Sequence, residues 1–177
     1  AQGDYRVVRT KKDLKDTLAK LREAELVAVD TETTGLRPME SELCGVSLSG
    51  ETGSGVYIPV RSPEADGHLA HDEAIEMLRP FLEDESIKKV GHNLKFDLLV
   101  LRRAGVELRG VVADTMITSY VVDAGRSGHG MDALALALLG RTCVPITDLI
   151  GTGKKQKRFD EVPLELAGPY AAEDADV

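Results

Sequence analysis

The hydrophobic positions in the first third of the chain fall into short continuous runs rather than at helical spacing. The run at 26–29 is bounded by polar residues and a glycine and is typical of a buried strand. Residues 43–48 and 56–60 form two more runs, and the segment 49–55 between them contains three glycines. Glycine-rich connections of this length join neighbouring strands. The pattern therefore predicts a three-stranded meander.

Elsewhere the apolar residues recur every three or four positions, which is the spacing of a helix that buries one face. The first such segment is 10–24, where Thr10 can cap the helix with Asp13 three positions on. The expected further helices are 71–82, 94–104, 115–123, 131–139 and 163–177, and the expected further strands are 87–90 and 111–113. Strands that alternate with helices predict an α/β layered domain with a mixed sheet flanked by helices.

The composition is that of an ordinary globular protein. Of the 177 residues 42% are hydrophobic and 29% charged, which suffices for one domain over 1–177 and not for two. The two cysteines lie far apart, which favours a reduced, cytoplasmic setting and argues against a zinc site. No apolar run could span a bilayer, so no membrane association is expected. We expect a monomer, because no heptad or long apolar edge demands a partner.

The net charge of −8 disfavours a protein that holds nucleic acid through a broad basic surface. It does not exclude a site that handles a phosphodiester through bound cations, because the acidic ligands and their metal must be counted together. The charge is locally reversed in the loop 151–160. Lys154 and Lys155 in this loop are candidate contacts to backbone phosphates, and a solvated basic loop is the alternative.

Two acidic residues follow the first predicted strand. Asp30 and Glu32 are two positions apart, and side chains two apart on a strand point to the same face. Two carboxylates held side by side repel each other unless a proton or a cation lies between them. Oxygen ligands of this kind suit Mg²⁺ or Mn²⁺. The alternative is a strand that runs out into a solvated acidic turn.

Two further acids stand at comparable places. Asp97 falls in the opening turn of a helix that follows a short strand, where it can bind a ligand or simply complement the helix dipole. Asn93 just before it fits an N-cap as well as a site residue. Tyr170 and Asp174 are four apart and share one helix face, with small alanines beside them that would let the helix lie close to a sheet. Glu173 and Asp176 point elsewhere on that helix and are expected to be solvated.

Taken together, these stretches match a known pattern. Asp30, Glu32, Asp97 and Asp174, with Tyr170 four before the last, resemble the three exonuclease motifs of the DEDD superfamily in its tyrosine branch. The local sequence around these residues is similar to that of the proofreading 3′→5′ exonuclease domains of family A DNA polymerases, the Klenow-fragment type found in bacterial DNA polymerase I. The matching segments are DTETTGL, VGHNLKFD, ELRGVVADTM and YAAEDADV.

The resemblance implies a ribonuclease-H-like three-layer fold and hydrolysis of a DNA strand from its 3′ end to nucleoside 5′-monophosphates. It also implies that the chain is a fragment of a longer polymerase, cut in its last helix, with the polymerase domain in the same full-length chain. The substrate is then a single-stranded DNA 3′ end. The implied cofactors are two divalent cations, Mg²⁺ or Mn²⁺, with Zn²⁺ able to occupy one site in crystals.

The resemblance also assigns roles to residues. Asp30 would bridge the two ions, and Glu32 and Asp174 would help to hold the one that binds the attacking water. Asp97 would support the second ion through water, and Tyr170 would orient the nucleophile. The implied substrate contacts are Thr31, Asn93 and an apolar wedge at Leu36, with a second wedge near Ile146. No histidine stands four before Asp174, where a related branch carries one.

Three other functions fit parts of the sequence. Ribonuclease D relatives share these motifs and act on RNA, although the phrases around Asp97 and Tyr170 favour the polymerase branch. A catalytically silent DNA-binding remnant is a second alternative, which the presence of all four acids disfavours. An aspartate-nucleophile phosphatase is a third, because residues 30–34 faintly resemble DxDxT, but Glu32 stands where that motif needs aspartate.

Overall fold

A computed structural model describes residues 3–64 and 66–177 of the chain. Its centre is a mixed six-stranded sheet in the order β1-β4-β3-β2-β5-β6. β3 runs antiparallel to both of its neighbours, whereas the pairs β1–β4, β2–β5 and β5–β6 are parallel. The predicted meander is thus β2-β3-β4. The strands are β1 (Asp4–Val7), β2 (Val27–Thr33), β3 (Leu43–Ser49), β4 (Ser54–Pro59), β5 (Lys89–Gly91) and β6 (Val111–Asp114).

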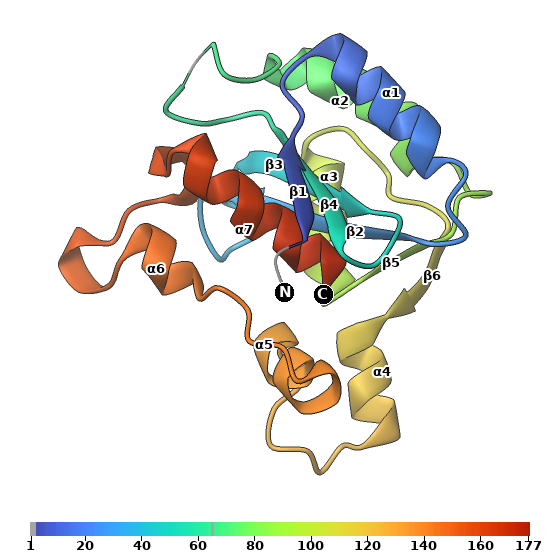
Figure 1. Ribbon diagram of the computed structural model, residues 1–177, viewed down its shortest axis with the longest axis vertical. Coiled ribbons are helices and arrows are strands. Elements are labelled where there is room, and N and C mark those ends of the chain that lie inside the picture. Colours follow the sequence, from blue (N-terminus) through green and yellow to red (C-terminus); the bar gives the residue numbers. More distant parts are fainter. Residues whose placement is uncertain (1–2, 65) are drawn as a thin grey trace.

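Helices cover both faces of this sheet and give three layers, as Figure 1 shows. α1, α2 and α3 share one apolar core with the strands, and α7 crosses β1, β4, β3 and β2 on the other face. The helices are α1 (Lys11–Leu21), α2 (His71–Leu82), α3 (Leu94–Arg103), α4 (Thr115–Val122), α5 (Met131–Leu134), α6 (Ile146–Ile150) and α7 (Leu164–Asp176). A π-helical segment η1 (Ala135–Leu139) continues α5, and short 3₁₀ turns are η2 (Gly153–Lys155) and η3 (Phe159–Glu161).

The predicted fold class is confirmed, and most predicted elements begin and end within a few residues of the observed ones. Thr10 caps α1 as expected, since its hydroxyl oxygen accepts from the amide of Asp13 at 3.1 Å. Among the strands and α-helices, two were not predicted. β1 has two exposed charged residues that alternate with two half-buried ones, so it lacks an apolar signature, and it pairs with distant β4. α6 is a single turn and a half in a segment without helical periodicity.

The two faces of the sheet bury different cores. Alternation along β2 sends Val27 and Val29 to the α1–α3 side, where they pack with Leu14, Leu78 and Leu101. On the α7 side a smaller cluster forms from Cys44, Tyr57, Phe159, Val162, Leu164, Ala167 and Ala171. The smaller cluster leaves room on its face of β2 for side chains that are not apolar, and Asp30 and Glu32 occupy that face.

α7 lies unusually close to the sheet because small residues line the contact. A Cβ atom added to Gly55 on β4 would lie 2.3 Å from the carbonyl oxygen of Ala172, and one added to Gly168 would lie 2.2 Å from Cγ2 of Val7. A side chain at Gly55 would meet the helix backbone and force α7 away, and one at Gly168 would require Val7 or the helix to move. The two glycines were not predicted to matter. The alanines that were predicted to let this helix lie close to the sheet are buried, with Ala171 and Ala172 0% exposed. Together these small residues fix how far α7 stands from β2.

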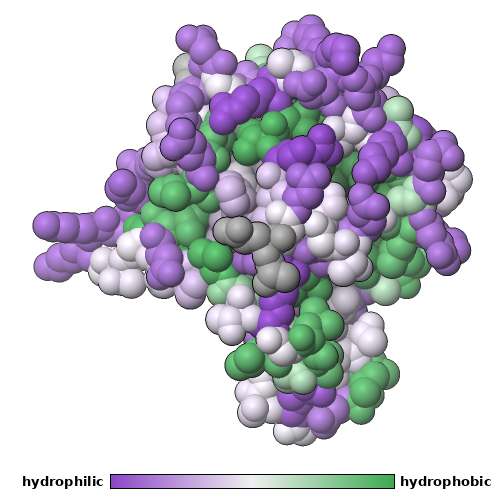
Figure 2. Space-filling view, viewed as in Figure 1, coloured by the Kyte–Doolittle hydropathy of each residue, from purple (hydrophilic) through white to green (hydrophobic). Residues whose placement is uncertain are grey.

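α4, α5 and η1 form a lobe that projects from the body of the molecule (Figure 1). Figure 2 shows apolar side chains gathered on this lobe, and the exposed ones among them are Ile117, Tyr120, Val121, Val122, Leu136, Leu138 and Leu139. None of the helices in the described part of the chain combines the length and apolar character that a membrane crossing requires.

Candidate active site

β2 presents Asp30 and Glu32 on the α7 face of the sheet. β5 pairs only with Val27 and Ala28 of β2, so the rest of β2 has no strand on that edge. At Asp30 and Glu32 the strand is still bonded to β3 on its other edge, opposite Ser47 and Gly45. The two acids are therefore held by a regular ladder on one side and lie beside an open edge on the other.

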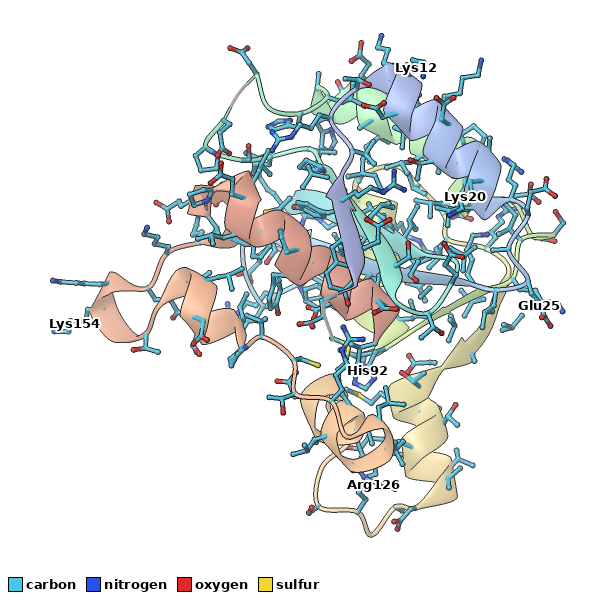
Figure 3. The ribbon with its side chains drawn as sticks, viewed as in Figure 1. Lys12, Lys20, Glu25, His92, Arg126 and Lys154 are labelled. Carbon is cyan, nitrogen blue, oxygen red and sulfur yellow. The ribbon has the colours of Figure 1, made fainter. Side chains whose placement is uncertain are left out.

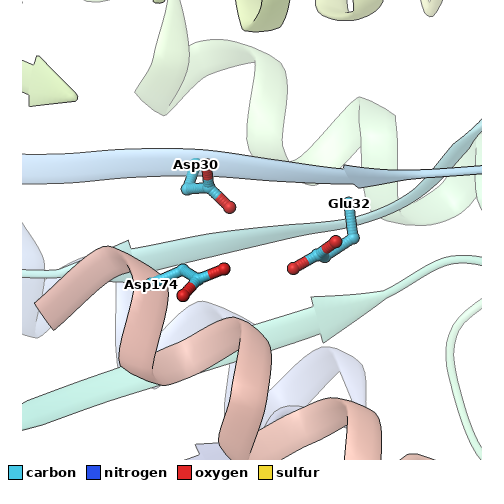
Figure 4. Close-up of side chains that lie close together, drawn as sticks. All are labelled: Asp30, Glu32 and Asp174. Carbon is cyan, nitrogen blue, oxygen red and sulfur yellow. The ribbon is translucent and has the colours of Figure 1, made fainter. Parts of the chain in front are cut away.

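The last helix brings a third acid to the same place. Asp174 on α7 faces Asp30 and Glu32, as Figure 4 shows. One carboxylate oxygen from each of the three lies within 4.8 Å of the others. Asp174 lies more than 140 positions after Asp30 and Glu32 in the chain, and the close packing of α7 on β4 brings it to them. The alternative of a solvated acidic turn after β2 is not what the structure shows.

The arrangement is chemically incomplete without a cation. Oε1 of Glu32 is buried and, among the described residues, has no hydrogen-bond partner. A buried carboxylate oxygen without a donor is costly, and three carboxylates at this spacing repel one another. A hard divalent cation bound by oxygen ligands would remove both costs. The donor set of three carboxylates therefore fits a cation of the Mg²⁺ or Mn²⁺ type.

Asp97 approaches this group from α3. It lies in the first turn of the helix and is only 3% exposed. Its Oδ1 accepts a hydrogen bond of 2.5 Å from the hydroxyl of Thr31, which points to the α3 side of β2. The structure thus places Thr31 against Asp97 rather than toward the surface. Asp97 is not one of the three acids within 4.8 Å, but its charge acts on both Asp30 and Glu32.

Burial raises the pKa of every acid in the group, and for Asp30 and Glu32 repulsion from the other acids adds to it. The pKa of Asp30 lies well above its usual range because the carboxyl is buried and because Asp97, Glu32 and Asp174 surround it. The pKa of Glu32 is raised in the same way. Burial raises the pKa of Asp97 to about 6 and that of Asp174 to about 7. The group therefore takes up protons at higher pH than free carboxyl groups do, and bound cations would take the place of those protons.

Tyr170 stands one helical turn before Asp174 on the same face of α7. Burial, followed by the charges of Asp174 and Glu32, raises the pKa of its hydroxyl far above the ordinary value. The hydroxyl consequently stays protonated at neutral pH. Its hydrogen bond to Asp174 lowers the pKa of that acid in part. Its ring packs at the edge of the second core, with its centroid 6.0 Å from that of Phe159.

One side of the acid group opens onto a cavity of about 610 Å³ between the body and the lobe. Asp30 and Asp174 line it from β2 and α7. The opposite wall is formed by residues of the lobe and of the β5–α3 connection, namely His92, Thr115, Thr118, Ser119, Val122, Arg126, Met131, Leu134 and Leu138. The three acids Asp30, Glu32 and Asp174 are thus only partly exposed, and Asp30 and Asp174 can be reached from this cavity.

No role was predicted for Asp114, but the structure shows that its carboxylate organises this region. Its carboxylate accepts hydrogen bonds from the amides of Asn93 and Leu94 at the start of α3 and of Met116 and Ile117 at the start of α4. One side chain therefore caps two helices. The dipeptide Asp-Thr before the expected helix at 115 could have indicated the cap on α4, but nothing local indicates the cap on α3.

Asn93 occupies the N-cap position of α3, but within the described chain its side chain makes no capping bond. It adopts the left-handed conformation, with φ of 59°, which asparagine tolerates better than most residues. Asn93 makes a backbone turn in which the free amides of Asn93 and Leu94 donate to Asp114. This turn directs the first turn of α3, which carries Asp97, toward β2.

The other residues predicted to contact the substrate lie in three separate segments. Leu36 follows β2 in a loop and is 95% exposed, as a wedge against a base requires. Ile146 opens α6 and packs against the cluster that includes Tyr170. Lys154 and Lys155 lie on η2 and are exposed. Figure 3 shows Lys154 projecting outward at the tip of that loop, away from the body.

The expectation that Glu173 and Asp176 are solvated is wrong. Glu173 is 9% exposed and accepts hydrogen bonds from Arg141 at 3.0 Å and from the amide of Val144 at 3.0 Å. Asp176 accepts from Tyr5, Gly53 and Arg141 at 2.6–2.8 Å. The partners lie between 29 and 171 positions away in the chain, so local spacing gives no sign of them.

A mixed sheet with helices on both faces, and acids that converge from β2 and the last helix, is the arrangement of a ribonuclease-H-like fold with a candidate metal site. The fold is similar to that of Trypanosoma brucei RNase D in complex with GMP, with a TM-score of 0.76 and 20% identity over 97% of this chain and 54% of that one. The chain belongs to the 3′-5′ exonuclease family, whose model matches residues 5–177. Exonucleases of this family use divalent metal ions.

Sequence relatives narrow the family further. The chain is 43% identical to DNA polymerase I of Pseudomonas aeruginosa, and the match covers all of this chain and 20% of the relative. It is 41% identical to DNA polymerase I of Rhizobium leguminosarum, over 98% of this chain and 19% of that protein. The chain therefore corresponds to the 3′-5′ exonuclease region of DNA polymerase I, and it spans about a fifth of the length of these relatives.

Proposed function

We propose that this domain removes nucleotides from the 3′ end of single-stranded DNA as nucleoside 5′-monophosphates and acts as the proofreading part of a DNA polymerase I. The observation that carries the proposal is the convergence of Asp30, Glu32 and Asp174 within 4.8 Å in a chain of the 3′-5′ exonuclease family. Relatives named DNA polymerase I, about five times as long, support a polymerase domain in the same full-length chain.

The chain's own residues suit a two-cation hydrolase. Asp30, Glu32 and Asp174 would hold one Mg²⁺ or Mn²⁺ ion, and Asp30 with Asp97 would support a second. Bound divalent ions supply charge stabilisation to an in-line displacement and lower the pKa of a water nucleophile toward neutrality. Phosphoryl transfer depends chiefly on placement and charge neutralisation. A site built of carboxylates therefore needs no histidine base.

Tyr170 would act on the nucleophile by position and not as a base. Because its hydroxyl stays protonated, it can donate or accept one directed hydrogen bond, while its ring is fixed against Phe159. Leu36 would wedge against the terminal base, and such apolar contacts tolerate any base sequence. Thr31 and Asn93 would act through the placement of Asp97 and of the α3 turn. Lys154 and Lys155 would meet phosphates farther along the strand.

The test is digestion of a single-stranded DNA labelled at its 5′ end, with Mg²⁺ at pH 8. We expect stepwise shortening from the 3′ end with release of nucleoside 5′-monophosphates, and no cleavage in EDTA. A matched RNA of the same sequence is expected to be shortened more slowly. RNA digestion as fast as that of DNA would move the assignment to a ribonuclease D-like enzyme, and DNA binding without shortening would indicate a silent remnant.

A further inference from the structure

The last turn of α7 is tied to three distant segments by a buried ionic network. Arg141 donates to Oε1 of Glu173 at 3.0 Å and to Oδ2 of Asp176 at 2.8 Å, and it also donates to the hydroxyl of Tyr5 on β1. The Tyr5 hydroxyl in turn donates to Asp176 at 2.7 Å. The amide of Gly53, in the β3–β4 turn, donates to the second oxygen of Asp176 at 2.6 Å.

The network is largely shielded from solvent, and its carboxylate oxygens all have hydrogen-bond donors. The side chains of Arg141, Glu173 and Asp176 are 19%, 11% and 1% exposed. The second oxygen of Glu173 accepts from the amide of Val144 at 3.0 Å, so each of the four carboxylate oxygens has a donor. Buried pairs of this kind fix geometry, and removal of one partner leaves an uncompensated charge.

The two acids of the network flank Asp174 in α7. Glu173 precedes Asp174 directly and Asp176 follows two positions later, so the network grips the helix on both sides of Asp174. Carboxylates at the C-terminal end of a helix oppose its dipole. Pro169 also removes one backbone hydrogen bond from α7 just before Tyr170. The turn that carries Asp174 is therefore not held by helical propensity alone.

Arg141 also stands where the lobe joins the body. It directly follows Gly140, which ends η1 in the left-handed conformation with φ of 65°. The same lobe forms the far wall of the cavity into which Asp30 and Asp174 face. A single guanidinium group thus connects the base of the lobe, β1 and the last turn of α7.

We propose that Arg141 is a positioning residue of the exonuclease site: by holding Glu173 and Asp176, it keeps the carboxylate of Asp174 at the spacing from Asp30 and Glu32 at which a divalent cation binds. Arg141 itself touches neither the cation nor the substrate. The inference rests on the proposed function for the use of the site, but its first consequence, on metal affinity, can be measured without any nuclease assay.

The test is calorimetric titration of Mn²⁺ into wild type and Arg141→Gln at a temperature where circular dichroism shows both to be folded. We expect Arg141→Gln to raise the Kd for Mn²⁺ at least tenfold, because Asp174 is no longer fixed. The matched control is Arg22→Gln, which breaks the Arg22–Asp84 pair of 2.8 Å between α1 and the end of α2. The control is expected to lower the melting temperature and to leave the Kd for Mn²⁺ unchanged.

A milder variant keeps the test decisive if Arg141→Gln does not fold. Tyr5→Phe removes one hydroxyl from the network and leaves the charges paired, and we expect a two- to fivefold rise in the Kd. An unchanged Kd in the folded variants overturns the inference, and so does an equal rise in Arg22→Gln, because the effect would then follow stability alone. If wild type itself binds no Mn²⁺, the proposed function fails instead, which separates the two failures.

Discussion

Asp30→Asn is expected to lower the rate of nucleotide release by on the order of 10³-fold or more and to abolish tight Mn²⁺ binding. The charges of Asp97, Glu32 and Asp174 all raise the pKa of Asp30, so Asp30 is the ligand that both cations would share. Loss of several kcal/mol of charge stabilisation corresponds to a loss of this size. The measurement is a single-turnover assay on 5′-labelled DNA, paired with Mn²⁺ titration.

The same variant is expected to stabilise the metal-free protein. The amide of asparagine has nearly the shape of the carboxylate and removes a buried charge that Asp97, Glu32 and Asp174 repel. We expect the melting temperature in EDTA at pH 8 to rise by about 2 to 8 °C, which corresponds to about 1–2 kcal/mol. Asp16→Asn, at an exposed acid of α1 paired with Lys12 at 2.9 Å, is the matched control and should change neither activity nor Mn²⁺ binding.

Retention of more than a tenth of the wild-type rate in Asp30→Asn would contradict the role given to this residue. A fall in melting temperature without metal would show that the carboxylate is stabilised by something other than a cation. The combination of lost activity and gained stability is the distinctive expectation, because a variant that merely damages the fold loses both.

The second large effect is on the pH dependence of stability: without metal the free energy of unfolding should fall as the pH rises, and bound divalent cations should cancel that fall. The folded-state pKa is about 6 for Asp97 and about 7 for Asp174, above their ordinary value near 4. Between pH 4 and 7 the folded protein therefore binds protons that the unfolded chain has released. The contribution of these groups to stability is complete below pH 4 and is lost as the pH rises toward 7.

Divalent cations should cancel this loss because they take the place of the protons. At pH 8 and a Mn²⁺ concentration of 100 times the Kd, binding adds about 2.7 kcal/mol, or about 5–10 °C in melting temperature. At pH 5 the same addition should give a much smaller rise, because protons compete. Differential scanning fluorimetry with Mn²⁺ and with EDTA across pH 5–8 measures both curves.

Asp174→Asn serves as the internal reference for the pH series. It removes the acid with a pKa of about 7, so its metal-free melting temperature should exceed that of wild type by an amount that grows from pH 5 to pH 8. A difference between variant and wild type that stays constant over this range would mean that Asp174 does not bind a proton in the folded protein.

The part of the site that lies on one strand could be read from the sequence. Alternation along 27–33 puts Asp30 and Glu32 on one face, and helical spacing puts Tyr170 and Asp174 on another. That these two faces meet depends on Gly55 and Gly168, which allow α7 to approach β4 and β1. Spacing within one element predicts which side chains share a face, but contacts between elements come from packing that no local pattern contains.

The network around Arg141 illustrates what local reasoning misses. Glu173 and Asp176 lie beside a functional acid on an amphipathic helix, and the usual expectation for such residues is solvation. Their partners come from β1, the β3–β4 turn and the segment before α6. β1 itself was not predicted, so the position of Tyr5 could not enter the interpretation. Asp114 was missed for a similar reason, since one of its two capped helices precedes it in the chain.

The most direct measurement is a crystal structure of the protein soaked in Mn²⁺, with the ions located by anomalous scattering. We expect one peak in contact with Asp30, Glu32 and Asp174, and a second beside Asp30 on the side of Asp97. Occupied Mn²⁺ sites elsewhere, with the carboxylate of Asp30 left free at a concentration that supports nucleotide release, would contradict the assignment of these acids.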